Sequence, residues 1–132
     1  MTFPITVVHV ANLSPDMENL YIVDAKWPKE LSRYASGVTQ WLKAAAPAEG
    51  LVTWLRQDPL RWPTFCEVYW SDLANNPHRW EALREAASRQ PVILVHANDS
   101  DRYNPAMALA RFIEQQLATP DDSTPQANKA LS

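Results

Sequence analysis

The strongest constraint on the fold is a continuous apolar run late in the chain, Pro91 to Ala97 (PVILVHA). A run of this length, rich in β-branched residues and without polar alternation, is typical of a strand covered on both faces. Two similar runs come early, at 5–11 (ITVVHVA) and 20–24 (LYIVD). Because helical spacing dominates the chain between the early and late runs, we expect crossover connections, which join parallel strands. The sequence therefore predicts an α/β fold, a small three-layer-type domain with a mostly parallel sheet flanked by helices.

Prolines mark the starts of several predicted helices. Asp58, Asn76 and Asn104 each precede a proline, and such a pair combines a side-chain cap with a first residue that needs no N–H donor. Segment 38–46 fits either a short strand or a helix, since its alanines favour a helix and its beginning favours a strand. Apolar residues three and four positions apart predict helices at 47–57, 59–73, 77–87 and 105–117.

Length and composition indicate one globular domain. The chain has 132 residues, of which 46% are hydrophobic and 20% charged, and this suits a single core. Its six tryptophans predict that aromatic side chains fill much of that core. We expect a single α/β domain at 1–118 and a disordered tail at 119–132, where the residues are small and polar.

The same counts disfavour several function classes. A formal net charge of −3 lacks the basic excess of a duplex nucleic-acid binder. The single cysteine, Cys66, lies in an apolar helical pattern, which predicts a small buried side chain and excludes an internal disulfide. His9 and His78 have no partner at metal-ligand spacing, so we expect no metal.

Two further absences in the sequence bear on cofactors and location. With only two glycines, the chain has neither a dinucleotide fingerprint nor a phosphate loop, and we expect no cofactor. Its beginning lacks a basic stretch followed by a long apolar run, and no segment is apolar enough to span a bilayer. We therefore expect a cytoplasmic protein without membrane contact.

Several motifs, taken in order, resemble a known family. The motif DAKWPK at 24–29 is followed by WLK at 41–43 and DPLRW at 58–62, and the strand at 92–95 by Asn104. This order is similar to the YeaO-like branch of the family known as domain of unknown function 488, over roughly residues 20–117. The resemblance implies a compact cytosolic α/β fold and no established activity.

The chain also departs from the pattern of that family. It has Ala25 where the family has Arg, and Gln57 where the family has His. Both changes remove a cationic or titratable side chain. The resemblance therefore implies a member that keeps the scaffold and has lost polar positions.

Polar residues follow two of the predicted strands and form the candidate site. Asp24 ends one strand, while His96, Asn98 and Asn104 end or follow another. Ligands of parallel sheets bind outside the carboxyl ends of the strands, where a helix N-terminus offers N–H groups to an anion. Asp24 and His96 are therefore candidate catalytic residues, His96 because an imidazole titrates near neutral pH. The alternative is structural: Asn104 as a helix cap, Asp24 as an acceptor for backbone N–H groups, and His96 as a hydrogen-bonded strand residue.

A small cationic cluster supplies further candidate ligand-binding residues. Lys26 and Lys29 flank Trp27, and this group could grip a phosphate or stack a base, although a solvated loop has the same composition. Together with Asn98 and Asn104, these residues predict binding of a small anionic ligand.

Three functional hypotheses remain open on the sequence. The first is a divergent, non-catalytic or weakly catalytic domain that binds a small anionic ligand. The second is an enzyme acting on a nucleotide-like or sugar-phosphate substrate, with Asp24 as the acid/base group and His96 assisting. The third is a protein-interaction module or homodimer, which would gain support if Trp41 or Trp70 were exposed on an apolar patch.

Overall fold

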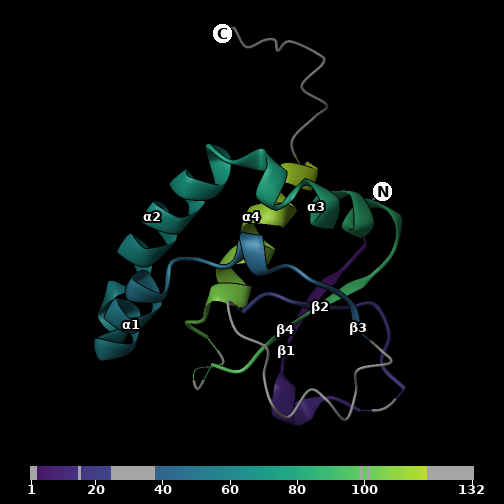
Figure 1. Cartoon of the computed structure of the whole chain (residues 1–132), viewed down its shortest axis with the longest axis horizontal. Helices are drawn as coiled ribbons and strands as arrows, with labels where there is room; N and C mark the ends of the chain where they lie inside the picture. The colour runs from purple at the N-terminus through teal and green to yellow at the C-terminus, as the bar shows by residue number, and fades with distance from the viewer. Residues whose placement is uncertain (1–2, 15, 25–37, 99, 101, 119–132) are drawn as a thin grey trace, which may run out of the picture.

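Four parallel strands form one sheet in the part of the chain that the structure describes (Figure 1). The computed structural model describes residues 3–14, 16–24, 38–98, 100 and 102–118. Every strand pairing is parallel, so the predicted α/β fold is confirmed. The predicted tail at 119–132 lies outside the described residues. The order across the sheet is β1 (Ile5–His9), β4 (Val92–His96), β2 (Leu20–Ile22) and β3 (Val38–Trp41).

The late apolar run forms an inner strand of this sheet, as predicted. In β4, Leu94 is paired with Val7 of β1 on one side and with Tyr21 of β2 on the other. Val92, Leu94 and Val95 are fully buried. Because β4 has a strand on each side and apolar cover on each face, polar side chains are excluded along most of its length.

Segment 38–46 divides into a strand and a turn, which resolves the alternatives that the sequence left open. Val38 and Trp41 pair with Leu20 and Ile22 of β2, and the strand hydrogen bonds outweigh the helix preference of the neighbouring residues. The alanines then form a 3-10 turn, η3 (Lys43–Ala45). The segment therefore begins as a strand and continues as a helical turn, as its two halves separately favour.

The predicted helices are present, each within a few residues of its expected bounds. Two of them begin with a 3-10 turn at the predicted proline, η4 (Pro59–Arg61) before α2 and η5 (Pro77–Arg79) before α3. Among the described helices, none combines the length and hydropathy needed to cross a membrane. The α-helices are α1 (Glu49–Gln57), α2 (Trp62–Ala74), α3 (Glu81–Arg89) and α4 (Pro105–Ala118).

Two of the three predicted caps are confirmed and one is wrong. Asp58 Oδ1 accepts from Leu60 N at 3.0 Å, and Asn104 Oδ1 accepts from Met107 N at 2.8 Å. Asn76 occupies a cap position but makes no side-chain cap bond. Its Nδ2 instead donates to the carbonyl of Asp72 at 2.8 Å, because the end of α2 leaves carbonyl acceptors within reach of the same amide.

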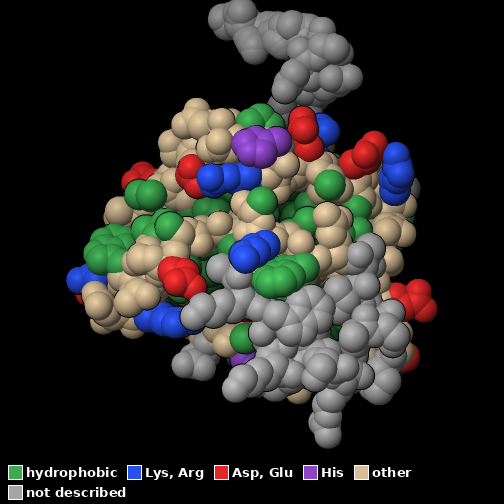
Figure 2. Space-filling model, in the orientation of Figure 1, with side chains coloured by type: hydrophobic (Ala, Val, Ile, Leu, Met, Phe, Trp, Pro, Cys, Tyr) green, Lys and Arg blue, Asp and Glu red, His purple; other side chains and the backbone are tan. Residues whose placement is uncertain are grey.

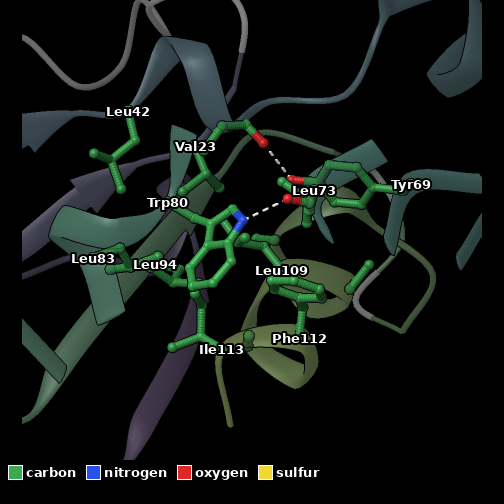
Figure 3. Close-up of a cluster of buried hydrophobic side chains, with 14 of the residues drawn as sticks. Val23, Leu42, Tyr69, Leu73, Trp80, Leu83, Leu94, Leu109, Phe112 and Ile113 are labelled. Carbon is green, nitrogen blue, oxygen red and sulfur yellow. Dashed lines mark hydrogen bonds between the residues drawn. The ribbon is translucent and has the colours of Figure 1, made fainter. Parts of the chain in front are cut away.

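The main core lies between the sheet and the helices. Side chains at alternate strand positions, such as Val7, Tyr21 and Leu94, face the helices. Helix α4 packs on β1 and β4, and α2 and α3 pack on α4, as the arrangement in Figure 1 shows. Figure 3 shows this cluster around Trp80, whose Nε1 donates to the carbonyl of Leu73 at 2.7 Å.

A smaller apolar cluster covers the other face of the sheet. The strand residues Leu20, Ile22 and Val95 pack there against Val10 and Leu13, which follow β1. Val10 belongs to a 3-10 turn, η1 (Val10–Asn12). In the described residues the sheet is therefore covered unequally, with all four α-helices contributing to the cluster on one face.

Four of the five tryptophans in the described residues are packing residues, as predicted. Trp80 is buried, and Trp54, Trp62 and Trp70 are partly buried against the main core. Buried indole N–H groups need acceptors, and Trp70 Nε1 donates to the Ala108 carbonyl at 2.8 Å.

We expect removal of a helix side chain from the main core to destabilise the fold strongly. Leu109 is fully buried on α4, whereas Leu60 is 87% exposed. Leu109→Ala should lower the free energy of unfolding by about 3 kcal/mol, while Leu60→Ala should change it by less than about 0.5 kcal/mol. Urea unfolding followed by tryptophan fluorescence measures both values, and equal losses would contradict the placement of α4 at the centre.

Candidate functional site

Asp24 and the residues after β4 meet at the carboxyl ends of the strands, as the sequence predicted. The parallel register pairs Ile22 with Val95, so the residues two positions beyond them also lie close together. Asp24 Oδ2 accepts a hydrogen bond from the N–H of Ala97 at 2.9 Å. The predicted convergence of Asp24 with the segment after β4 is therefore a consequence of strand register.

Two histidines lie side by side at the end of β1 and β4. His9 is the register partner of His96, and their ring centroids are 5.2 Å apart with the planes nearly perpendicular. His9 Nδ1 accepts from Ala11 N at 2.9 Å, and His96 Nδ1 accepts from Asn98 N at 3.1 Å. An imidazole that accepts through Nδ1 carries its proton on Nε2. Each ring therefore positions the backbone that follows its own strand.

His9 is the member of this group that the sequence did not identify. Sequence spacing bears on His9 only as a metal ligand, because nothing in the sequence shows that β1 is the neighbour of β4. Both histidines are the last residues of their strands. With the strand order known, this matching position would have predicted that the two side chains lie together.

The segment between β4 and α4 is held by its own amide side chains. Asn98 Oδ1 accepts from Ser100 N at 3.1 Å. Asn104 Nδ2 donates to the Ser100 carbonyl at 2.8 Å, while its Oδ1 caps α4. Asn98 and Asn104 are buried. Both predicted binding residues therefore hold the backbone of this segment in place, and Asn104 both donates and accepts a hydrogen bond.

Burial dominates the electrostatics of Asp24. Desolvation raises the pKa of this carboxyl above its ordinary value of 3.8, while the Ala97 N–H and the charges of Arg56 and His9 act in the opposite direction. The main-chain carbonyl of Asp24 accepts from Trp41 Nε1 at 2.8 Å. The carboxyl is thus half-buried, and the residue is held by hydrogen bonds at both its backbone and its side chain.

In the part of the chain that the structure describes, no further candidate group joins this site. Lys26, Trp27 and Lys29 lie outside the described residues. In the described ranges, no three His, Cys, Asp or Glu side chains are grouped so that they could hold a metal ion. Cys66 is buried on α2, and burial raises the pKa of its thiol to about 11. It is therefore the small buried side chain that the sequence predicted, protonated at neutral pH.

Comparison with known proteins places the chain in a family. A family profile described as "Inactive DUF488-N3 subclade" matches residues 5–131. The chain belongs to the DUF488 family. It is also 25% identical over 92 residues to "Uncharacterized protein YeaO" of Escherichia coli (strain K12), which covers 70% of this chain and 80% of YeaO. No solved structure matches the chain.

The family assignment confirms the resemblance that the motifs indicated and extends it. The motifs predicted likeness over roughly residues 20–117, whereas the profile begins at residue 5 and so includes β1 and His9. The DUF488 profile therefore covers all strands from which the site is built.

We expect Asn104 to act chiefly as a structural residue. Asn104→Ala removes the cap of α4 and the bond to the Ser100 carbonyl, so it should lower the free energy of unfolding by about 1–2 kcal/mol. Asn75→Ala, at an exposed position after α2, is the matched control and should have little effect. Thermal and urea unfolding measure the difference, and an unchanged stability for Asn104→Ala would contradict the cap assignment.

We expect Asp24 to disfavour the folded state as it ionises. The pKa of Asp24 is higher in the folded chain than its ordinary value of 3.8, so the bound proton stabilises the fold fully below pH 3.8. This stabilisation is lost as the pH rises through the folded pKa. Asp24→Asn keeps an oxygen acceptor for Ala97 and cannot ionise. The variant should therefore gain stability relative to the parent between acid and neutral pH.

Asp16→Asn is the control for this pH dependence. Ser14 Oγ donates to Asp16 Oδ1 at 2.6 Å, and this bond lowers the pKa of Asp16, so its contribution has the opposite sign. Urea unfolding at a series of pH values compares the two variants. A relative gain for Asp16→Asn, or a loss for Asp24→Asn as pH rises, would contradict the assigned environments.

Proposed function

We propose that this DUF488 protein is a non-catalytic or weakly catalytic domain that binds a small anionic ligand beyond the carboxyl ends of β2 and β4. The observation that carries the proposal is that the polar side chains of the site are hydrogen-bonded to the protein's own backbone. Asp24, His96 and Asn98 each accept from a backbone N–H of the chain between 97 and 100. They fix the entrance to α4, and the profile of the matching subclade is described as inactive.

The sign of the ligand follows from the positive groups around this position. Helix α4 begins at Pro105 after the fixed segment, and a helix N-terminus carries partial positive charge. The charge of Arg56 acts on the Asp24 carboxyl from α1. Lys26 and Lys29 would add cations, as the sequence indicates. An anion of phosphate size could exchange its water for these donors.

The charge pattern on the face shown in Figure 2 favours a small ligand over an extended polyanion. Basic and acidic side chains are interspersed over the described part of the face in Figure 2. Such mixing gives no single-sign field that would attract a polyanion. A small anion, recognised at one position, suits this surface better than a nucleic acid does.

A second candidate function is an enzyme that acts on a nucleotide-like or sugar-phosphate substrate. The specific observation in its favour is the raised pKa of Asp24, on which the charge of His9 also acts, since a carboxyl with a raised pKa can act as a general acid. In that reaction Asp24 would transfer the proton, with His96 assisting. Asp24→Asn would then abolish turnover while leaving the fold intact.

The interaction-module hypothesis receives limited support from the tryptophans. Trp41 is 36% exposed, and Lys43 Nζ lies 5.5 Å from its ring centroid. Trp70 is partly buried against the core, with its indole nitrogen bonded to α4. Only Trp41 of the two therefore approaches the exposure that this hypothesis requires.

The binding proposal is tested by ligand-dependent stabilisation. Purified protein is screened by thermal shift against inorganic phosphate, nucleotides and phosphorylated sugars, and hits are repeated by equilibrium dialysis. A ligand at about 100 times its Kd adds about 2.7 kcal/mol to the folded state, so we expect the melting temperature to rise by several degrees.

A pair of arginine variants locates the binding. Arg56→Gln should reduce the ligand-induced shift, whereas Arg84→Gln, at an exposed position on α3, should leave it unchanged. A flat profile across the phosphorylated compounds contradicts the binding proposal. Turnover of any of them that Asp24→Asn abolishes favours the enzyme instead.

A further inference from the structure

Strand β1 lies at an edge of the sheet and is incompletely covered. In the described part of the chain, β4 is the one strand hydrogen-bonded to it. Its side chains are half-buried, apart from Thr6, which is exposed, whereas all of β2 is buried. Partly exposed β-branched residues on an edge strand leave both apolar surface and backbone groups in contact with solvent.

The outward-facing backbone groups of β1 follow from its register. The carbonyl of Pro4 accepts from Val92 N at 3.3 Å, so residue 4 faces β4. Backbone groups alternate along a strand, and therefore Thr6 and Val8 also face β4. The N–H and C=O groups of Ile5, Val7 and His9 then point away from the sheet.

The described residues of β1 carry none of the sequence features that usually protect an edge strand. Natural edge strands carry Lys, inward-pointing charges, Pro or a bulge that prevents pairing with another chain. The sequence of β1 is ITVVH, without an acidic residue, a lysine or a proline. Its pairing with β4 is also continuous from Ile5 to His9, without a bulge. An unprotected edge of this kind is suited to accept a further strand.

We propose that β1 pairs with β1 of a second copy of this chain, antiparallel across a two-fold axis at Val7. This arrangement places Val7 opposite its own counterpart, Ile5 opposite His9, and Thr6 opposite Val8. No like charges meet, and β-branched residues dominate the contacts, a combination that stabilises cross-strand pairs. The same strand thus serves as both partners, as a closed two-fold interface requires.

The size of this contact sets its expected strength. The strand has five residues, and pairing it with its counterpart buries less area than a standard interface. We therefore expect a dimer that forms with increasing concentration and exchanges with the monomer. In the dimer, the two four-stranded sheets would continue into one another.

Charge variants at Thr6 test the interface without touching either core cluster. Thr6 is exposed, and across the proposed axis its two copies lie diagonally opposite, within reach of long side chains. Sedimentation equilibrium and light scattering over a wide range of concentration should show the parent chain approaching twice its monomer mass. Thr6→Lys should raise the dimer Kd by about tenfold.

Mixing variants distinguishes the proposed pairing from other contacts. Thr6→Lys and Thr6→Glu should each dimerise weakly alone, and an equimolar mixture should recover association because the diagonal charges then attract. Thr53→Lys, exposed on α1, is the control and should dimerise as the parent does, and melting curves check that every variant is folded. A parent chain that stays monomeric throughout overturns the proposal, as does a dimer that is insensitive to both Thr6 variants.

Discussion

The fold depends on the two-sided pairing of β4. Its register with β1 on one side and β2 on the other aligns the ends of three strands, and both apolar clusters include residues of β4. A shift of one residue in this strand would exchange its two faces and remove both sets of contacts at once. The cores and the candidate site are therefore fixed by the same hydrogen-bonded ladder.

The site illustrates how a scaffold can persist while its polar residues serve the backbone. Asp24 and His96 stand where a ligand of a parallel sheet is expected, yet both accept from N–H groups of the segment leading to α4. These bonds hold the start of α4 against the end of the sheet. A DUF488 chain would use these side chains to position that segment whether or not it performs a reaction.

Much of the fold could be predicted because local pattern and tertiary structure agree. The run 91–97 indicates an inner strand, and the caps at Asp58 and Asn104 follow from short-range hydrogen bonding that sequence displays directly. Agreement of this kind is typical of natural sequences. A parallel sheet also places Asp24 and the end of β4 at the same edge, whereas their direct hydrogen bond depends on β2 lying beside β4.

The remaining features depended on partners that are distant in the sequence. His9 became part of the site only through strand order, and segment 38–46 began as a strand because β2 lies beside it. Asn76 failed as a cap because Asp72, at the end of the preceding helix, offered its amide a competing acceptor. In each case the local sequence indicates which structures are possible, and a contact with a residue of another helix or strand determines which one forms.

The unequal cover of the two sheet faces has a consequence for how this chain can vary. Among the described residues, the small cluster includes only Val10, Leu13 and Met17 beyond the strands themselves, and opening these contacts requires less free energy than global unfolding. Substitutions at Val10 and Leu13 should therefore leave the helical layer intact. Sequence differences between relatives should therefore be tolerated more readily on that side of the sheet than in the helical layer.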